Sequence, residues 1–172
     1  MSSDVRFTDF KSHVQPTWCP GCGDYGTMNG LMKALANTGK DPDETFVTTG
    51  IGCSGKLATY LDTYSFHGVH GRALPVAIGT KVANPNLTVV AAGGDGDGYS
   101  IGGNHFIHGV RRNVDMTYMV MDNRIYGLTK GQASPTSREE LETGTTPHGQ
   151  EQPPVNPLAL ALAADATFIA QS

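Results

Sequence analysis

Three β-rich runs, each ending at a glycine-rich or polar turn, constrain the fold of this chain most strongly. They are "ETFVTTG" (44–50), "LTVVAAGG" (87–94) and "DMTYMVMDN" (115–123). Segments with helical character separate them, and this alternation predicts an α/β fold built on a parallel sheet. Ligands bind beyond the carboxyl ends of the strands in such sheets, so the turns after these runs are expected to form the functional site.

The remaining segments are predicted from periodicity and from turn and helix signals. Residues 1–17 lack periodicity and are expected to form an extended lead-in. Residues 124–156 are polar and rich in Pro, Gly and Thr, which predicts a long loop, and residues 167–172 are predicted to be a strand. Five segments have the apolar spacing or the small residues of a helix: 27–39, 55–64, 71–85, 101–112 and 157–166.

The charge and composition of the chain exclude several classes of function. Its 172 residues suffice for one domain with a sizeable core. A net charge of -4 with only 12 Lys and Arg gives no polycation character, so neither nucleic acid nor an anionic membrane is an expected partner. No apolar run approaches the length of about 18 residues that spans a bilayer. The N-terminus also lacks the apolar region of a secretory signal, which predicts a cytoplasmic protein.

The turn "GGDGDG" after the second run has the features of an anion site that also needs a cation. Backbone amides in a glycine-rich turn before a helix suit a phosphate, but carboxylates beside a phosphate need a cation between them. Asn123 follows Asp95 after one helix and one strand, which returns the chain to the same sheet edge. A carboxylate, an amide oxygen and a backbone carbonyl would suit Mg²⁺ with a diphosphate. On its own, "GGDGDG" is more typical of an ordinary strand-to-helix turn.

The stretch "WCPGCGDYG" (18–26) contains two of the three cysteines of the chain, Cys19 and Cys22, and the third is Cys53. An odd number of cysteines in a reducing compartment argues against a disulfide framework. The CxxC spacing by itself is typical of zinc, of an iron–sulfur cluster or of a redox dithiol. Three thiolates are one short of a four-cysteine metal site.

Five motifs in order resemble the β subunit of 2-oxoacid:ferredoxin oxidoreductases. They are "WCPGCGDYG", "GIGCSGK", "FHGVHGRALPVAIG", "GGDGDGYSIGGNH" and "MDNRIYGLTKGQ". The resemblance implies the parallel-sheet α/β fold that binds the diphosphate of thiamine diphosphate. It implies a single domain over residues 1–172, with a cysteine knuckle at about 15–26. The family continues beyond the equivalent of Ser172, so the chain is expected to be truncated, with the C-terminal part of the fold missing.

The resemblance also implies the reaction and the partners. The family oxidatively decarboxylates a 2-oxoacid with coenzyme A, giving an acyl-CoA and carbon dioxide, and passes the electrons through a 4Fe-4S cluster to ferredoxin. We expect 2-oxoglutarate as the substrate, with pyruvate as the alternative. The catalytic glutamate of the family comes from an α subunit, so this chain is expected to be inactive alone.

Roles follow from the matched positions. Asp95 and Asn123 are expected to bind Mg²⁺ through side chains, and Ile125 through its backbone carbonyl. Lys56 is expected to face the substrate carboxylate, and His70 to act in the same pocket. The cluster ligands are expected to be Cys19, Cys22 and Cys53, with the fourth family cysteine absent from this chain. The residues expected to line thiamine diphosphate are Ile51, Gly52, Cys53, Ser54, His70, Gly71, Gly94, Gly96, Asp97, Gly127 and Leu128.

Several alternatives stay open at this point. A thiamine enzyme without redox chemistry would share the GDG…N pattern without needing the cysteines. A zinc-knuckle binding module would bind zinc and no thiamine. A third alternative is an inactive fragment that binds the cofactor. Two neighbouring residues are expected to be structural: Trp18 packs beside the knuckle, and the Asp122 side chain faces away from Asn123 because strand residues alternate.

Overall fold

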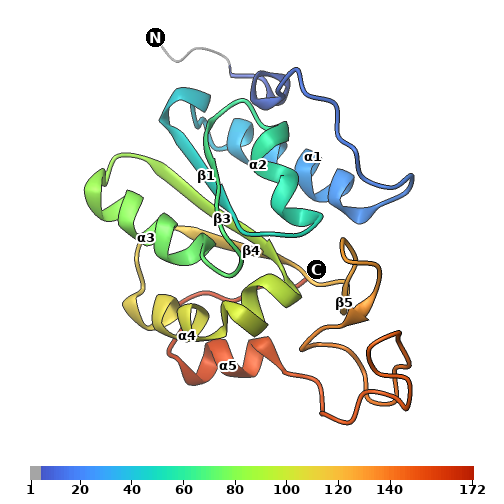
Figure 1. Ribbon diagram of the computed structural model, residues 1–172. Coiled ribbons are helices and arrows are strands. Elements are labelled where there is room, and N and C mark those ends of the chain that lie inside the picture. Colours follow the sequence, from blue (N-terminus) through green and yellow to red (C-terminus); the bar gives the residue numbers. More distant parts are fainter. Residues whose placement is uncertain (1–4) are drawn as a thin grey trace.

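The computed structural model describes residues 5–172; residues 1–4, where the predicted lead-in and the predicted single domain begin, lie outside the described part. Four parallel strands form the central sheet in the order β2-β1-β3-β4 (Figure 1). Their bounds are β1 Thr45–Thr49, β2 Tyr64–His67, β3 Thr88–Gly94 and β4 Thr117–Met121. The predicted α/β fold with a parallel sheet is confirmed.

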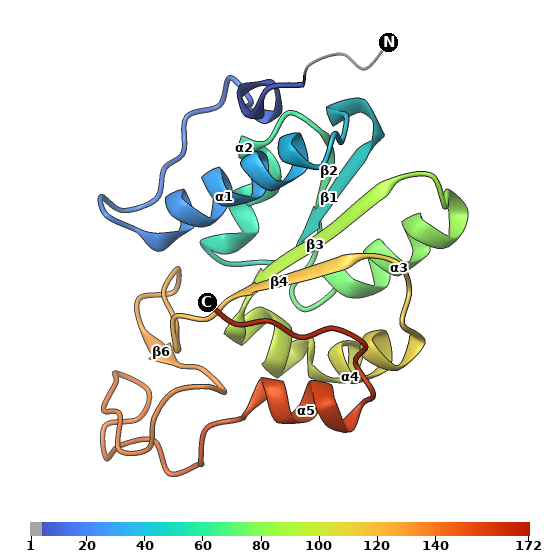
Figure 2. The same cartoon turned by 180° about the vertical axis from the view of Figure 1, so that it is seen from behind.

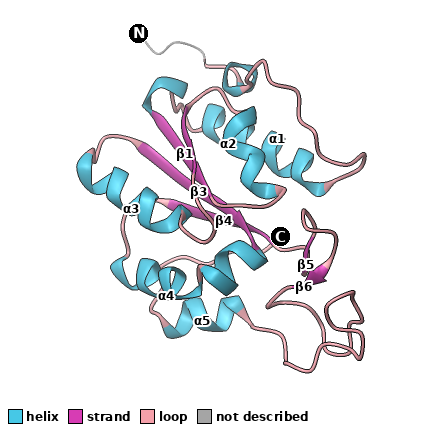
Figure 3. Cartoon of the chain, viewed as in Figure 1, coloured by secondary structure: helices cyan, strands magenta, loops and turns pink. Residues whose placement is uncertain are grey.

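Helices cover both faces of this sheet (Figure 3). The last helix, α5 Pro157–Ala163, is capped by Asn156, whose Oδ1 accepts a hydrogen bond from the N–H of Ala159 at 3.0 Å. Pro157 occupies the first turn of this helix. The helices are α1 Gly23–Asn37, α2 Leu57–Tyr60, α3 Ala73–Ala83, α4 Gly103–Arg112 and α5 Pro157–Ala163. Short helical turns are η1 Phe7–Phe10, η2 Pro42–Glu44, η3 Ser54–Lys56 and the π-helical η4 Gly96–Ile101.

Two apolar cores follow from the alternation of side chains along the strands. On one face Val47 and Val90 pack with the buried face of α1. That face has the spacing of an amphipathic helix, and its residues are Met28, Leu31, Met32 and Leu35. On the other face Val89 and Ala91 pack with α3, α4 and α5. Each large side chain buried in this way contributes roughly 1.5–3 kcal/mol to stability.

The strand β2 was missed by the sequence prediction, which placed a helix over 55–64. The helix there is shorter than predicted, because α2 ends at Tyr60 and the backbone is extended at Leu61. All four residues of β2 are exposed at the edge of the sheet. A strand that buries no side chain has no apolar run or alternation from which it could be recognised.

Two further segments differ from expectation in detail. Residues 167–172 form neither a helix nor a strand, so the predicted strand is wrong; Figure 2 shows this tail running beside β4, and Ile169 packs against the second core. The long loop at 124–156 is confirmed except for a small hairpin, β5 Ile125–Tyr126 and β6 Gln132–Ala133. Within residues 5–172, no helix combines the length and the apolar character needed to cross a membrane.

Candidate functional site

Four loops meet at the carboxyl edge of the sheet, one after each parallel strand. β1 lies between β2 and β3. The chain therefore passes from β1 to β2 on one side of β1, and then crosses to β3 on the other side. Such a switch point is where open α/β sheets bind ligands. A cleft of about 1530 Å³ opens along this edge and past β4, and every predicted site residue except Lys56 and Gly71 contributes to its wall.

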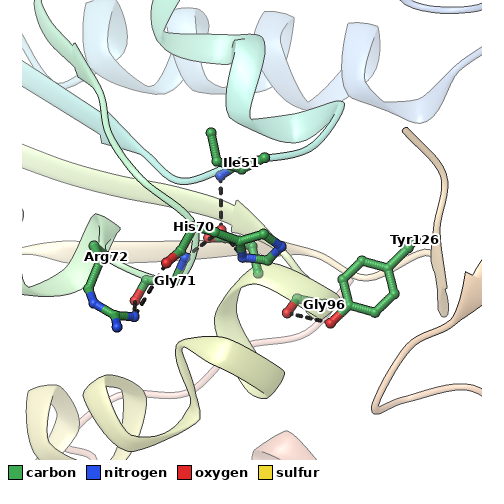
Figure 4. A network of polar contacts seen from close by, with 7 residues as sticks. Ile51, His70, Gly71, Arg72, Gly96 and Tyr126 are labelled. Atoms are coloured by element: carbon green, nitrogen blue, oxygen red, sulfur yellow. Dashed lines mark hydrogen bonds and ion pairs between the residues drawn. The ribbon is translucent and has the colours of Figure 1, made fainter. Parts of the chain in front are cut away.

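Asp97 ties three of these loops together, as Figure 4 shows for its partners. Its Oδ1 accepts hydrogen bonds from the backbone N–H of Ile51 at 2.9 Å and of Gly71 at 2.7 Å. The side chain is 2 % exposed. Asp97, which is expected to line the cofactor, contributes to the wall of the cleft, and its carboxylate also holds the turns after β1 and β2 against the turn after β3.

The chain has no room for a side chain at Gly50, because an added Cβ would overlap the carboxylate of Asp97. We therefore expect Gly50→Ala to lower the free energy of unfolding by about 1–3 kcal/mol, the usual cost of overpacking. Urea unfolding followed by circular dichroism measures this. Gly79→Ala is the matched control, since Gly79 lies in α3 with open space around its Cβ position. The control should be neutral or stabilising, and equal losses in both variants would contradict the role of Asp97.

His70 lies beside this network, at the mouth of the cleft. Its Nδ1 is 3.1 Å from Asp97 Oδ1, but no hydrogen bond of acceptable geometry satisfies this nitrogen. The two atoms are therefore close enough for an ion pair, but they do not form a hydrogen bond. The His70 ring lies 6.2 Å from the Tyr126 ring, so the loops after β2 and β4 face each other across the site (Figure 4). The catalytic role of His70 stays a prediction.

The predicted Mg²⁺ ligands come from the ends of β3 and β4. Asp95 is 1 % exposed and follows the last residue of β3. Asn123 begins a tight turn in which its Oδ1 accepts a hydrogen bond from the N–H of Ile125 at 3.1 Å. Carboxylate, amide and carbonyl oxygens are the hard donors that Mg²⁺ prefers, so the chemistry of this donor set fits the ion.

The surroundings of this donor set are acidic. Burial raises the pKa of Tyr99, and the nearby carboxylates of Asp122 and Asp95 raise it further, so the phenol stays neutral. Burial likewise raises the pKa of Tyr118, with Asp97 adding in the same direction. The carboxylates of Asp95 and Asp122 near Tyr99, and of Asp97 near Tyr118, make this part of the cleft acidic.

Asp122 lies on the same side as the carboxylate of Asp95, because Thr136 contacts both; that it faces away from Asn123 stays a prediction. β4 ends at Met121, so the alternation of a strand no longer applies at Asp122. Its Oδ1 accepts a hydrogen bond from the N–H of Arg124 at 3.0 Å and lies 2.8 Å from the hydroxyl oxygen of Thr136. The Thr136 hydroxyl is also 2.8 Å from Asp95 Oδ2.

Gly96 allows the loop after β4 to close on the turn after β3. A Cβ at Gly96 would overlap the ring of Tyr126, and the Tyr126 hydroxyl donates to the Gly96 carbonyl at 3.1 Å. Figure 4 shows this pair facing His70 and Gly71. Gly96 begins the π-helical turn η4, a conformation that is frequent at functional sites. The missing Cβ of Gly96 is therefore what lets the Tyr126 ring pack against the backbone of this turn.

The cysteine knuckle forms a tight turn before α1. The N–H of Cys22 donates to the carbonyl of Cys19 at 3.0 Å, and Gly21 supplies the positive φ of 78° that the turn needs. The indole of Trp18 donates to the carbonyl of Cys53 at 2.7 Å, which joins the knuckle to the loop after β1. Trp18 also packs edge-on against Tyr25 and Tyr60, as expected for a structural residue.

The three cysteines are free thiols on the wall of one cleft. Burial raises the pKa of Cys22; a hydrogen bond from the backbone of Asp24 opposes this rise, and the Asp24 carboxylate and Cys53 add to it. Soft thiolates are the donors of iron–sulfur clusters, so the donor type fits the expected cluster. No three His, Cys, Asp or Glu side chains among residues 5–172 are arranged together as a metal site, so the ligand sets stay predictions.

Lys56 does not reach the cleft. Its Nζ donates to the hydroxyl of Thr17 at 3.1 Å, and Lys56 is only half-buried. No sequence pattern distinguishes Ser134, Thr136 and Ser137, which are buried, and of which Thr136 lines the cleft. They lie in a loop of polar residues, where hydroxyl groups are ordinary, so only their burial distinguishes them.

Comparison with known proteins supports the same interpretation. Residues 50–172 match the family model of the C-terminal TPP binding domain of thiamine pyrophosphate enzymes; thiamine pyrophosphate is thiamine diphosphate. The chain is 48% identical over 164 residues to 2-oxoglutarate oxidoreductase subunit KorB of Mycobacterium tuberculosis. It is 47% identical over 163 residues to the β subunit of 2-oxoacid:ferredoxin oxidoreductase 2 of Aeropyrum pernix. Each alignment covers 95% of this chain, with 44% of the first relative and 53% of the second.

A solved structure shares the fold closely. The 2-oxoglutarate:ferredoxin oxidoreductase from Magnetococcus marinus, with 2-oxoglutarate, coenzyme A and succinyl-CoA bound, matches with a TM-score of 0.93 and 53% identity. The match covers 95% of this chain and 56% of that chain. The chain thus spans about half the length of the relatives it matches. It belongs to the thiamine pyrophosphate enzyme family through its cofactor-binding domain, and its relatives there are β subunits of 2-oxoacid:ferredoxin oxidoreductases.

Proposed function

We propose that this chain acts in the β subunit of a 2-oxoacid:ferredoxin oxidoreductase. The reaction is the oxidative decarboxylation of a 2-oxoacid with coenzyme A, giving an acyl-CoA and carbon dioxide. The two electrons pass through a 4Fe-4S cluster to ferredoxin. The chain works with an α subunit, in the cytoplasm, and the proposal involves neither nucleic acid nor a membrane.

The placement of Asp95 carries this proposal. Its buried carboxylate lies at the carboxyl edge of β3, next to the switch point and to the turn that contains Asn123 and Ile125. In the proposal these residues hold Mg²⁺, and the Mg²⁺ holds the diphosphate of the cofactor. When bound, thiamine diphosphate supplies a thiazolium that can take up the electron pair released by decarboxylation. The chain's own part is to fix the position of that ring.

The loops around the cleft supply this positioning. Asp97 clamps the backbone of Ile51 and Gly71, so the turns after β1 and β2 keep one arrangement. Trp18 holds the carbonyl of Cys53, which keeps the cysteine knuckle close to the same loop. A cluster at these cysteines would lie beside the cofactor, and a short separation favours electron transfer between them. A fourth ligand would come from outside the three cysteines of this chain.

The relatives favour 2-oxoglutarate as the substrate. The solved relative is a 2-oxoglutarate enzyme with 2-oxoglutarate, coenzyme A and succinyl-CoA bound, and it shares 53% of aligned residues with this chain. The relative from Mycobacterium tuberculosis is also named for 2-oxoglutarate. The relative from Aeropyrum pernix is named only for a 2-oxoacid, so pyruvate is the competing substrate to assay.

The test is an elemental and cofactor analysis of anaerobically purified chain, with and without an α subunit. We expect about four iron atoms and four sulfides per chain, with thiamine diphosphate bound in the presence of Mg²⁺. Zinc without thiamine would identify a zinc-knuckle module instead. Thiamine without iron would leave a thiamine enzyme without redox chemistry, or an inactive cofactor-binding fragment, and would contradict the proposed electron path.

A further inference from the structure

Three buried hydroxyl side chains stand out in the long loop after β4. Ser134, Thr136 and Ser137 are 2 %, 5 % and 0 % exposed, although residues 138–140 that follow them are exposed. Burying a hydroxyl without a partner costs about 1–3 kcal/mol. This segment, here called the hydroxyl turn (Ser134–Ser137), therefore needs a set of hydrogen bonds that makes its burial favourable.

Some of these bonds close the turn on itself. The N–H of Ser134 donates to Ser137 Oγ at 2.7 Å, and the N–H of Ser137 donates to the Ser134 carbonyl at 3.1 Å. The Pro135 carbonyl accepts from the N–H of Val155 at 2.8 Å, which fixes the turn to the far end of the loop. The turn is thus a defined local structure and not a passive stretch of loop.

The remaining bonds all end at the residues around the proposed Mg²⁺ site. The Thr136 hydroxyl lies 2.8 Å from both Asp95 Oδ2 and Asp122 Oδ1. Ser137 Oγ donates to the Arg124 carbonyl at 2.6 Å. Arg124 lies between Asn123 and Ile125 in the chain and has a positive φ of 60°, a conformation that costs a non-glycine residue free energy unless neighbours hold it.

The Thr136 contacts contain an imbalance that a cation would remove. A hydroxyl has one hydrogen, so it donates to one carboxylate and presents lone pairs to the other. The second contact therefore brings two electron-rich oxygens together in a nearly dry place, which is unfavourable without a positive charge close by. This geometry suits a hydroxyl that orients carboxylates around a metal ion.

We propose that the hydroxyl turn positions the Mg²⁺ ligands, with Thr136 fixing the carboxylate of Asp95 and Ser137 fixing the backbone between Asn123 and Ile125. The inference rests on the proposed thiamine diphosphate and Mg²⁺ site. Thr136 and Ser137 are positioning residues, because neither needs to touch the ion or the cofactor. Residues that orient metal ligands typically contribute about 10- to 100-fold to metal affinity.

The experiment compares Thr136→Val, Thr136→Ser and Ser137→Ala in the complete chain, with the α subunit present. Tryptophan fluorescence or calorimetry follows thiamine diphosphate binding while Mg²⁺ is titrated. Thr136→Val keeps the shape and loses the hydroxyl, so the Mg²⁺ midpoint should rise about 10-fold or more. Thr136→Ser keeps the hydroxyl and should stay within about threefold of the parent. Ser137→Ala should shift the midpoint in the same direction as Thr136→Val.

Thr143→Val is the matched control, because within residues 5–172 the Thr143 hydroxyl contacts only loop threonines such as Thr146, at 2.8 Å. It should leave the Mg²⁺ midpoint unchanged. A parent-like midpoint in Thr136→Val would overturn the inference and leave the proposed function standing. If Thr136→Val does not fold, a parent-like midpoint in Ser137→Ala overturns it. A parent chain that binds no thiamine diphosphate with Mg²⁺ overturns the proposed function and the inference together.

Discussion

Replacing Asp95 by alanine is expected to abolish Mg²⁺-dependent binding of thiamine diphosphate. Asp95 is the only carboxylate among the three proposed ligands, and it is 1 % exposed at the end of β3. Its loss leaves one amide and one carbonyl oxygen, which carry no charge to hold a divalent ion. Since residues that only orient ligands contribute about 10- to 100-fold, loss of the charged ligand should cost more than about 100-fold in affinity.

Calorimetry of thiamine diphosphate binding, with Mg²⁺ present or chelated, measures this effect. Asp115→Ala is the control, because the Asp115 side chain is 96% exposed and pairs on the surface with Lys81 at 3.2 Å. The control removes the same charge from the chain and should bind as the parent does. Unchanged binding in Asp95→Ala would remove the basis for assigning the GDG…N pattern to Mg²⁺ and diphosphate.

Elements that bury apolar side chains could be predicted from the sequence. The run that became β3 is continuous and apolar, and its middle residues Val89–Gly93 are buried. The spacing of Met28, Leu31, Met32 and Leu35 identified α1, although the helix begins four residues before the predicted start, at Gly23. β2 had no such signal because all of its residues are exposed. Burial leaves a pattern in the sequence, and edge position does not.

The residues of the site also differ in how far the sequence indicates them. The motifs identified which residues gather at the carboxyl edge, because a parallel sheet brings the ends of β1, β2, β3 and β4 together. They did not reveal which carboxylate accepts backbone N–H groups and which one meets a loop hydroxyl. Asp95 and Asp97 have the same neighbours in sequence, yet Asp97 accepts two backbone N–H groups while Asp95 meets Thr136. That distinction depends on the π-helical turn η4, which no local residue pattern specifies.

The role of the hydroxyl turn is even harder to predict from the sequence. Thr136 is about forty positions after Asp95, and its role depends on how a long irregular loop folds back. Loop conformation follows from many weak contacts, each worth about 1 kcal/mol, and not from periodicity. The chain therefore places its strongest sequence signals in the residues that would touch the ligands, and its weakest in those that position them.

Replacing Cys19 by alanine is expected to remove the iron–sulfur cluster and to leave thiamine diphosphate binding intact. Cys19 is exposed at the start of the knuckle and lies outside the proposed cofactor-binding residues. Cys19 is one of the three proposed cluster ligands that this chain supplies, so iron and sulfide should fall at least about fivefold per chain without it. Anaerobic elemental analysis and absorbance at about 400 nm measure the loss of the cluster.

The two variants together separate the two halves of the proposed function. Asp95→Ala should lose the thiamine cofactor and keep iron, whereas Cys19→Ala should lose iron and keep the cofactor. This reciprocity follows because the Mg²⁺ ligands lie at the ends of β3 and β4, while the cysteines lie before α1 and after β1. Zinc in the parent that disappears in Cys19→Ala would instead identify a zinc knuckle. Iron that persists in Cys19→Ala would contradict the assignment of Cys19 as a ligand.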